Sequence, residues 1–260
     1  MLRIAFFVDF SNLLGSLGRM NLKVEDYEEF FSHISKEAYD LLIKCKISGP
    51  ELPTLLSRVY WYAVGDCDYY NFEDEKTKEF LERLFNGNSE IKGTFLSNAG
   101  KQNPGLDPTS TYHKAFDAFL EDREAWYKGK QNNIKGFTDF YDMIRKQCDF
   151  IDINECGYWR LDFISKGVDE KGIDTALAVD SVTMAETYDI ALIVSGDADM
   201  IPSINYLKRQ GKYVGVVSFI KGSPPESKGR QQSKRLSRAS DFEVQIYETE
   251  LIRHKIARKQ

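Results

Sequence analysis

Short apolar runs alternate along the chain with longer stretches in which apolar residues recur at helical spacing. The apolar runs predict strands at residues 4–8, 58–64, 91–96, 150–154, 190–194 and 213–219. The stretches with helical spacing predict helices at residues 24–46, 70–85, 137–147, 174–187 and 201–209. Such an alternation is typical of an α/β fold with a central, mostly parallel sheet that is flanked by helices.

Residues 98–135 interrupt this alternation. The segment opens with NAGKQNPGLDPTS, whose Asn, Gly and Pro content is typical of a loop, and continues as a charged, aromatic stretch at helical spacing. We interpret it as a helical insertion in one domain that spans residues 1–246, followed at 247–260 by a basic helix or tail. A chain of 260 residues is long enough to bury a substantial core in this way.

Charge is distributed unevenly along the chain. The net charge is −5, but the part from Lys208 onward carries 13 Lys and Arg against 5 Asp and Glu. A basic C-terminal part on an acidic body favours an anionic partner such as nucleic acid. A basic tail that is merely solvated would give the same pattern, so charge leaves both interpretations open.

The sequence contains no signal for a membrane or for a zinc site. No apolar run approaches the roughly 20 residues of a membrane span. The four cysteines form no C-x-x-C pair, and the three histidines are scattered. We therefore expect free thiols in a reducing cytoplasm and no membrane partner.

Four aspartates accompany the ends of predicted strands and the starts of predicted helices. Asp9 follows the first strand in VDFSNL, and Asp197 and Asp199 follow a later strand in SGDADM. Asp174 opens a helix in KGIDTALAVDSV. Because the carboxyl ends of parallel strands share one edge of a sheet, we expect these carboxylates to converge there.

Converging carboxylates need a counter-charge. Two unit charges 4 Å apart repel by about 1 kcal/mol in water and by about 4 kcal/mol at an effective dielectric of 20. Carboxylate oxygens are hard ligands that suit Mg²⁺ or Mn²⁺, and a cation held this way commonly serves phosphoryl transfer. Taken singly, each acid is explained as a turn residue, and Asp174 and Asp199 as plain helix N-caps. No G-x-S-x-G or P-loop motif is present.

Four segments together resemble the NYN domain family of the PIN-like nuclease superfamily. They are FVDFSNL (7–13), KGIDTALAVDSV (171–182), SGDADMIPSINYLKRQGKYVGVV (195–217) and KRLSRASDFEVQI (234–246). The resemblance covers residues 1–97 and about 136–246. Ala198 and Met200 depart from the usual form of the acidic turn, but the acids themselves are intact.

The resemblance implies a PIN-like fold and a Mg²⁺- or Mn²⁺-dependent ribonuclease site. It implies metal-binding, catalytic carboxylates at Asp9, Asp174, Asp197 and Asp199, with Asn12 orienting Asp9 or contacting water or substrate. The resemblance also implies that Lys171, Ser195 and Ser11 contact the substrate and that Asp180 is an accessory acid. We expect an endoribonuclease whose partner is single-stranded or structured RNA; a homo-oligomer or a protein partner stays open.

Two other functions fit the same residues. One is a non-catalytic RNA-binding or protein-interaction module that keeps the acids for structure. The other is a phosphohydrolase that acts on nucleotides or small phosphate esters.

Three further segments have two interpretations each. GDCDYY (65–70) is either a second acidic turn at the site or a polar loop. The aromatic pair Trp126 and Tyr127, next to Lys128 and Lys130, either stacks on bases or belongs to the core. The basic stretch 221–238 either grips a phosphate backbone or forms a structural helix.

Overall fold

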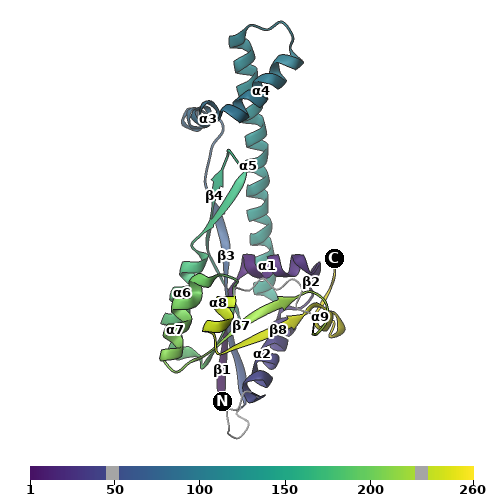
Figure 1. Ribbon diagram of the computed structural model, residues 1–260, viewed down its shortest axis with the longest axis vertical. Coiled ribbons are helices and arrows are strands. Elements are labelled where there is room, and N and C mark those ends of the chain that lie inside the picture. The colour runs from purple at the N-terminus through teal and green to yellow at the C-terminus, as the bar shows by residue number, and fades with distance from the viewer. Residues whose placement is uncertain (45–52, 226–233) are drawn as a thin grey trace. The chain divides into compact units, whose positions relative to one another are not determined.

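The computed structural model describes residues 1–44, 53–225 and 234–260, and the chain divides into two compact units (Figure 1). The core unit comprises residues 1–64, 140–157 and 172–260. The second unit comprises residues 65–139 and 158–171. The chain passes between the units four times: within β3, α5 and β4, and between Lys171 and Gly172 after β5.

The main sheet has seven strands in the order β5-β4-β3-β1-β6-β7-β8. Their bounds are β1 Leu2–Asp9, β3 Thr54–Cys67, β4 Ile151–Asp162, β5 Gly167–Lys171, β6 Ile190–Val194, β7 Tyr213–Ile220 and β8 Phe242–Tyr247. The pairs β3–β1, β1–β6, β6–β7 and β7–β8 are parallel, and β4–β5 is antiparallel. The prediction of a mostly parallel sheet in an α/β fold is confirmed.

Helices cover both faces of this sheet in the core unit (Figure 1). Their bounds are α1 Phe10–Arg19, α2 Tyr27–Lys44, α6 Ile173–Thr183, α7 Ile201–Arg209, α8 Lys234–Ala239 and α9 Glu248–Arg253, with 3-10 turns η1 Ala185–Thr187 and η2 Ala198–Met200. Successive strand residues point to opposite faces. Phe6 accordingly packs against Phe31 of α2, and Phe7 packs against Tyr188, which follows η1. Burial on both faces explains why β1 and β6 are continuously apolar.

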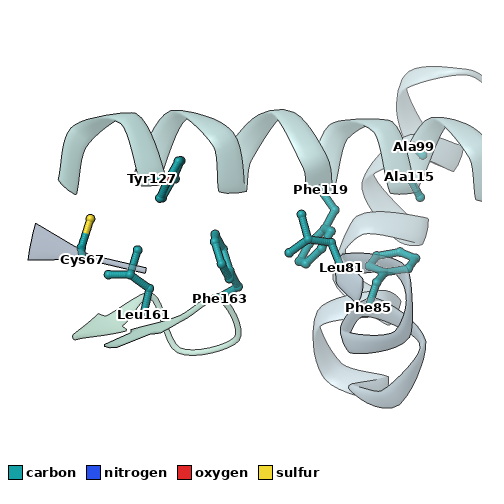
Figure 2. Close-up of a cluster of buried hydrophobic side chains, with 9 residues drawn as sticks. All are labelled: Cys67, Leu81, Phe85, Ala99, Ala115, Phe119, Tyr127, Leu161 and Phe163. Atoms are coloured by element: carbon teal, nitrogen blue, oxygen red, sulfur yellow. The ribbon is translucent and has the colours of Figure 1, made fainter. Parts of the chain in front are cut away.

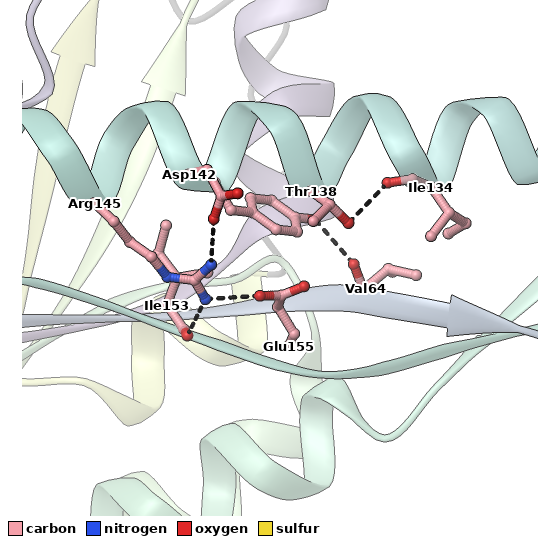
Figure 3. Close-up of polar contacts among 8 residues, drawn as sticks. Val64, Ile134, Thr138, Asp142, Arg145, Ile153 and Glu155 are labelled. Atoms are coloured by element: carbon pink, nitrogen blue, oxygen red, sulfur yellow. Dashed lines mark hydrogen bonds and ion pairs between the residues drawn. The ribbon is translucent and has the colours of Figure 1, made fainter.

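The last turns of α5 (Pro108–Gln147) are fixed in the core unit by polar contacts (Figure 3). Arg145 donates to the Ile153 carbonyl at 3.1 Å and forms ion pairs with Asp142 at 3.2 Å and Glu155 at 2.7 Å. The buried Tyr141 hydroxyl donates to the carbonyl of Val64 at 3.1 Å. These contacts hold the helix end against β3 and β4.

A small second sheet joins an early segment of the chain to its C-terminal segment. Strand β2 (Leu22–Val24) pairs antiparallel with β9 (Ala257–Lys259). Part of the predicted basic stretch, residues 226–233, lies outside the described residues, whereas Lys234–Ala239 form α8. The described part of the chain has no helix with both the length and the apolar character needed to span a membrane.

The second unit has its own hydrophobic core beneath α5 (Figure 2). Helices α3 (Glu75–Gly87), α4 (Ser89–Gln102) and α5 supply most of it, with the outer parts of β3 and β4. Its buried members are Cys67, Leu81, Phe85, Ala99, Ala115, Phe119, Tyr127, Leu161 and Phe163. Tyr127 is only 3% exposed and its hydroxyl accepts from the amide of Tyr70. It is therefore a core residue that has no face free for an RNA base.

Two predictions for this region are wrong. The strand predicted at 91–96 is instead part of α4. Its apolar residues Ile91, Phe95 and Ala99 recur every four positions, and the Asn88 carboxamide caps the helix by accepting from the amide of Ile91 at 2.9 Å. The helical stretch HKAFDAFLEDREAWYKGK and the helix predicted separately at 137–147 form one continuous helix from Pro108 to Gln147. Of the predicted loop NAGKQNPGLDPTS, residues 103–107 alone lie outside α4 and α5. The limits of the predicted insertion at 98–135 stay a prediction.

The acidic turn GDCDYY is explained by contacts inside the second unit. The Asp68 carboxylate accepts from the amide of Leu161 at 2.7 Å and from the hydroxyl of Tyr158. The Asp66 carboxylate accepts from the amide of Cys67 at 2.7 Å. These hydrogen bonds join the ends of β3 and β4, which favours the structural interpretation of the turn.

Gly215 tests the packing of the central strands. A Cβ at this position would meet the ring of Phe242 and lie 2.8 Å from Cδ2 of Leu192. We expect Gly215→Ala to lower the free energy of unfolding by about 1–3 kcal/mol, as overpacking commonly does. Gly129→Ala is the control, because nothing lies within 4 Å of that Cβ in helix α5; it should stabilise by about 0.5–1 kcal/mol. If urea unfolding gave the same change in the free energy of unfolding for Gly215→Ala and Gly129→Ala, this packing would be contradicted.

Candidate functional site

Asp9 lies at the junction between β1 and α1, and its carboxylate is fixed there. The residue is only 3% exposed. Its Oδ1 accepts from the backbone amide of Asn12 at 3.0 Å, and its Oδ2 accepts from the Asn12 side-chain amide. Asp is a preferred N-cap, and the helix dipole favours its ionised form. The strand end and the helix start therefore hold this carboxylate in one orientation.

Asn12 also connects the first strand with the strand beside it. Its Oδ1 accepts from the backbone amide of Gly196 at 3.2 Å. The parallel register pairs Val8 with Val194, so β1 and β6 end side by side. One side chain thus joins the turn after β1 to the turn after β6.

The turn after β6 organises two more acids. The buried Ser195 hydroxyl accepts from the amide of Asp197 at 3.1 Å. The Asp197 carboxylate accepts from the amide of Asp199 at 2.9 Å and caps η2. Asp197 is half-buried and Asp199 is exposed. Ser195 shapes this turn, which is the role its hydrogen bond supports.

Asp174 occupies the first turn of α6. Gly172 precedes the helix with a φ of +93°, a conformation that favours glycine, and a Cβ there would lie 2.9 Å from the carbonyl oxygen of Cys156. Partial burial raises the pKa of the Asp174 carboxyl above its usual range, and the negative charges of Asp9, Asp197 and Asp199 raise it further. Asp9, Asp197 and Asp199 therefore lie within electrostatic reach of Asp174. That the four acids form one site stays a prediction.

The four acids are suited to a cation by their chemistry. They offer only carboxylate oxygens, and in the described part of the chain the charged groups that act on Asp174 are all acids. Hard oxygen donors with a net negative field fit Mg²⁺ or Mn²⁺. As placed, however, no three His, Cys, Asp or Glu side chains in the described ranges are close enough together to complete a ligand set. The donor set thus fits a divalent cation, but its spacing is wider than that of a closed coordination shell.

Two predicted residues have other partners in the structure. Lys171 is exposed and forms an ion pair with Asp169 at 2.8 Å, within the second unit. The Asp180 carboxylate accepts from the buried Tyr62 hydroxyl at 3.0 Å, which fastens α6 to β3. Burial and the neighbouring Asp180 carboxylate both raise the pKa of Tyr62. Ser11 is exposed in the first turn of α1, two residues after Asp9.

A small cavity adjoins the acids and was not predicted from the sequence. It has a volume of about 30 Å³. Its polar lining consists of Asn12, Ser16, Arg19, Ser195, Gly196 and Ser218. The three residues from α1 are spaced by four and three positions, so they share one helix face. That spacing was the only available signal, because no motif marks Arg19.

Comparison with known proteins adds a family match. A family model described as NYN domain matches residues 108–245, more than half of the chain. The match includes Asp174, Asp197 and Asp199 and ends before α9, but it begins after Asp9 and Asn12. No curated protein matches. One solved structure, of a protein of unknown function from Vibrio parahaemolyticus, is 14% identical and aligns over 94% of this chain and 93% of that one, with a TM-score of 0.37. At that score the likeness carries no argument.

The raised pKa of Asp174 predicts a stability effect with a defined sign. An aspartate whose pKa is higher in the folded protein than the roughly 3.9 of an unfolded chain destabilises the fold once it ionises. We expect Asp174→Asn to stabilise the metal-free protein at pH 7. The gain should be on the order of 1 kcal/mol or less, because water screens this exposed group. It should vanish as the pH falls through the folded-state pKa towards about 3.9.

The stability of the Asp174→Asn variant is measured by unfolding in EDTA, which removes metal. Asp189 provides a control for which the same substitution should have the opposite effect on stability. Hydrogen bonds from Arg3 lower the pKa of the Asp189 carboxyl. Its ionised form therefore stabilises the fold above the unfolded pKa, and Asp189→Asn should destabilise at pH 7. An Asp174→Asn variant that loses stability at pH 7, as the control does, would show that the four acids do not repel one another.

Proposed function

The chain belongs to the NYN domain family, and from this premise we propose that it is a metal-dependent ribonuclease that hydrolyses RNA phosphodiester bonds. The match confirms the resemblance inferred from the motifs. The family has a nuclease-type fold, and RNA is its general substrate. Endonucleolytic cleavage of single-stranded or structured RNA is part of the proposal.

One observation carries the proposal more than any other. Partial burial raises the pKa of Asp174, and the charges of Asp9, Asp197 and Asp199 raise it further. Acids from three separate turns thus act on one carboxyl group, although each acid alone is explained as a cap or a turn residue. Mutual repulsion of this kind is costly to a fold and is characteristic of functional sites.

In the proposed site, Asp9, Asp174, Asp197 and Asp199 hold Mg²⁺ or Mn²⁺. A divalent cation bound there would neutralise phosphate charge and would lower the pKa of a bound water. Asn12 acts as a positioning residue, because it donates to Asp9 and accepts from Gly196.

The contributions of the remaining residues follow from their contacts. Ser11 is exposed at the start of α1, where its hydroxyl can donate to a phosphate oxygen. Ser195 contributes by shaping the acidic turn. Lys171 would have to exchange Asp169 for a phosphate, and Asp180 acts through the placement of α6. None of these four roles requires a nucleophilic side chain.

The experiment that tests this function measures cleavage of labelled single-stranded RNA, tRNA and single-stranded DNA in Mg²⁺, Mn²⁺ or EDTA. We expect metal-dependent cleavage of RNA. Asp9→Asn and Asp197→Asn should each reduce the rate by at least about 100-fold, since even partners outside a ligand shell commonly contribute roughly 10–100-fold. Melting temperatures should confirm that both variants fold.

Asp66→Asn is the matched control for these variants. Asp66 also follows a strand segment in an acidic turn, but its carboxylate accepts from the amide of Cys67 within the second unit. This variant should cut at the wild-type rate. Wild-type cleavage by Asp9→Asn or Asp197→Asn would refute the assigned carboxylates.

The two other functions give different results in the same assay. Tight RNA binding without metal-dependent cleavage identifies a non-catalytic module. Turnover of mononucleotides but not of oligonucleotides identifies a phosphohydrolase. Either result would overturn the ribonuclease proposal.

A further inference from the structure

The cavity beside the acids has the size and lining of a site for anionic oxygen atoms. A volume of about 30 Å³ holds one or two water-sized groups and is too small for a nucleobase. Its walls include Arg19, whose guanidinium has several N–H donors, and Ser16, Ser218 and Asn12, whose side chains donate to the Asn12 carbonyl, Glu243 and Asp9. A guanidinium is a group that binds phosphate oxygens.

The side chain of Arg19 runs back along α1 towards the acids. Arg19 is the last residue of that helix, so its backbone lies at the end remote from Asp9. Its Nη2 donates to Ser16 Oγ at 2.8 Å, and its Nη1 lies 3.4 Å from where a Cβ of Gly15 would be. Side chains on a helix point towards its N-terminus, which accounts for this direction.

A chain of hydrogen bonds connects Arg19 with the acidic site. Ser16 Oγ, which accepts from Arg19, donates to the carbonyl of Asn12 at 2.7 Å. Asn12 in turn contacts Asp9 and Gly196. The cavity and the carboxylates therefore share Asn12 and Gly196 as a common wall.

The charge of Arg19 is available to a ligand. In the described part of the chain, Arg19 forms no ion pair, whereas Lys208 is paired with Asp241 at 3.0 Å and Lys171 with Asp169. Arg19 is also exposed, so a polymer can reach it. Partial burial lowers the pKa of its guanidinium, but arginine remains charged in proteins. An acidic site needs such a cation nearby, because four carboxylates repel a polyanion.

We propose that Arg19, oriented by Ser16, binds an RNA phosphate adjacent to the one positioned at the four aspartates. This subsite rests on the proposed ribonuclease function and deepens it. It makes the preferred substrate an oligonucleotide with at least two phosphates, and it sets the register of the strand on the site.

The test measures RNA affinity separately from cleavage. The background is the Asp197→Asn protein in Mg²⁺, which should bind oligoribonucleotide without cutting it. Adding Arg19→Gln should weaken binding about tenfold at low salt, equivalent to 1.4 kcal/mol. It should also reduce the slope of log affinity against log salt by about one, because one phosphate contact is lost. Arg19→Lys should retain part of the affinity.

Arg209→Gln is the matched control. Arg209 ends α7 as Arg19 ends α1, and both helices begin near the acids. Arg209 is not among the residues that line the cavity. Removal of this arginine leaves the cavity intact, so affinity should change less than twofold. A tenfold loss in both variants would indicate general charge attraction and would overturn the subsite.

A methylphosphonate scan locates the contact on the RNA. Oligonucleotides with one neutral linkage at successive positions should bind the Asp197→Asn background weakly at one position. The Arg19→Gln protein should be insensitive at that same position. Uniform sensitivity at every position, or equal sensitivity of both proteins, overturns the proposal.

Failure of this inference is distinguishable from failure of the proposed function. If the wild type cuts RNA and Arg19→Gln binds with unchanged affinity and salt slope, the subsite is refuted and the ribonuclease stands. If the wild type never cuts but the position-specific effect of Arg19 persists, the subsite stands and the ribonuclease is refuted. A folded wild type that binds no RNA at low salt overturns both.

Discussion

The parallel pairing of β1 with β6 is the constraint on which the candidate site depends. It is an in-register pairing from Ile4 with Ile190 to Val8 with Val194, and both strands are buried on both faces. Burial of this kind specifies the register strongly, because a slip of one residue would turn every side chain to the opposite face. The residues that follow, Asp9 on one strand and Ser195 on the other, therefore leave the sheet at neighbouring points. Hydrophobic packing of the two strands thus fixes where Asp9 and Ser195 lie.

The site opposes electrostatic repulsion with local hydrogen bonds. Each of the turns that carry acids has its own restraint: Asn12 holds Asp9, Ser195 holds the amide of Asp197, and the left-handed Gly172 starts the helix of Asp174. These restraints hold the carboxylates in place, and the pKa of Asp174 is raised by partial burial and by the charges of the other three acids. A bound cation would relieve that repulsion and would thereby stabilise the fold.

Several cations in the core unit are held by internal contacts. Lys208 is paired with Asp241, and Arg145 contacts Glu155 and the carbonyl of Ile153. Arg19 instead donates to a neutral hydroxyl in a cavity next to the acids. Helix α8, with its exposed Lys234 and Arg238, contacts η2, the turn that contains Asp199. The acidic site therefore has basic residues near it, and these would reconcile a net negative chain with the proposed RNA substrate.

The sequence alone determined the α/β class and the four acids, because buried parallel strands leave a continuous apolar signal and VDFSNL and SGDADM follow two of them directly. It could not separate helix from strand at 91–96, where Ile91 and Phe95 fit a short apolar run, until packing in the second unit selected the 3.6-residue period. The sequence predicted Lys171 and Asp180 as site residues, but it could not predict their contacts with Asp169 and Tyr62. Only the tertiary structure brought Arg19 to Asn12 and Gly196, because the residues around that cavity lie up to about 200 positions apart and meet only when β6 and β7 are placed beside α1.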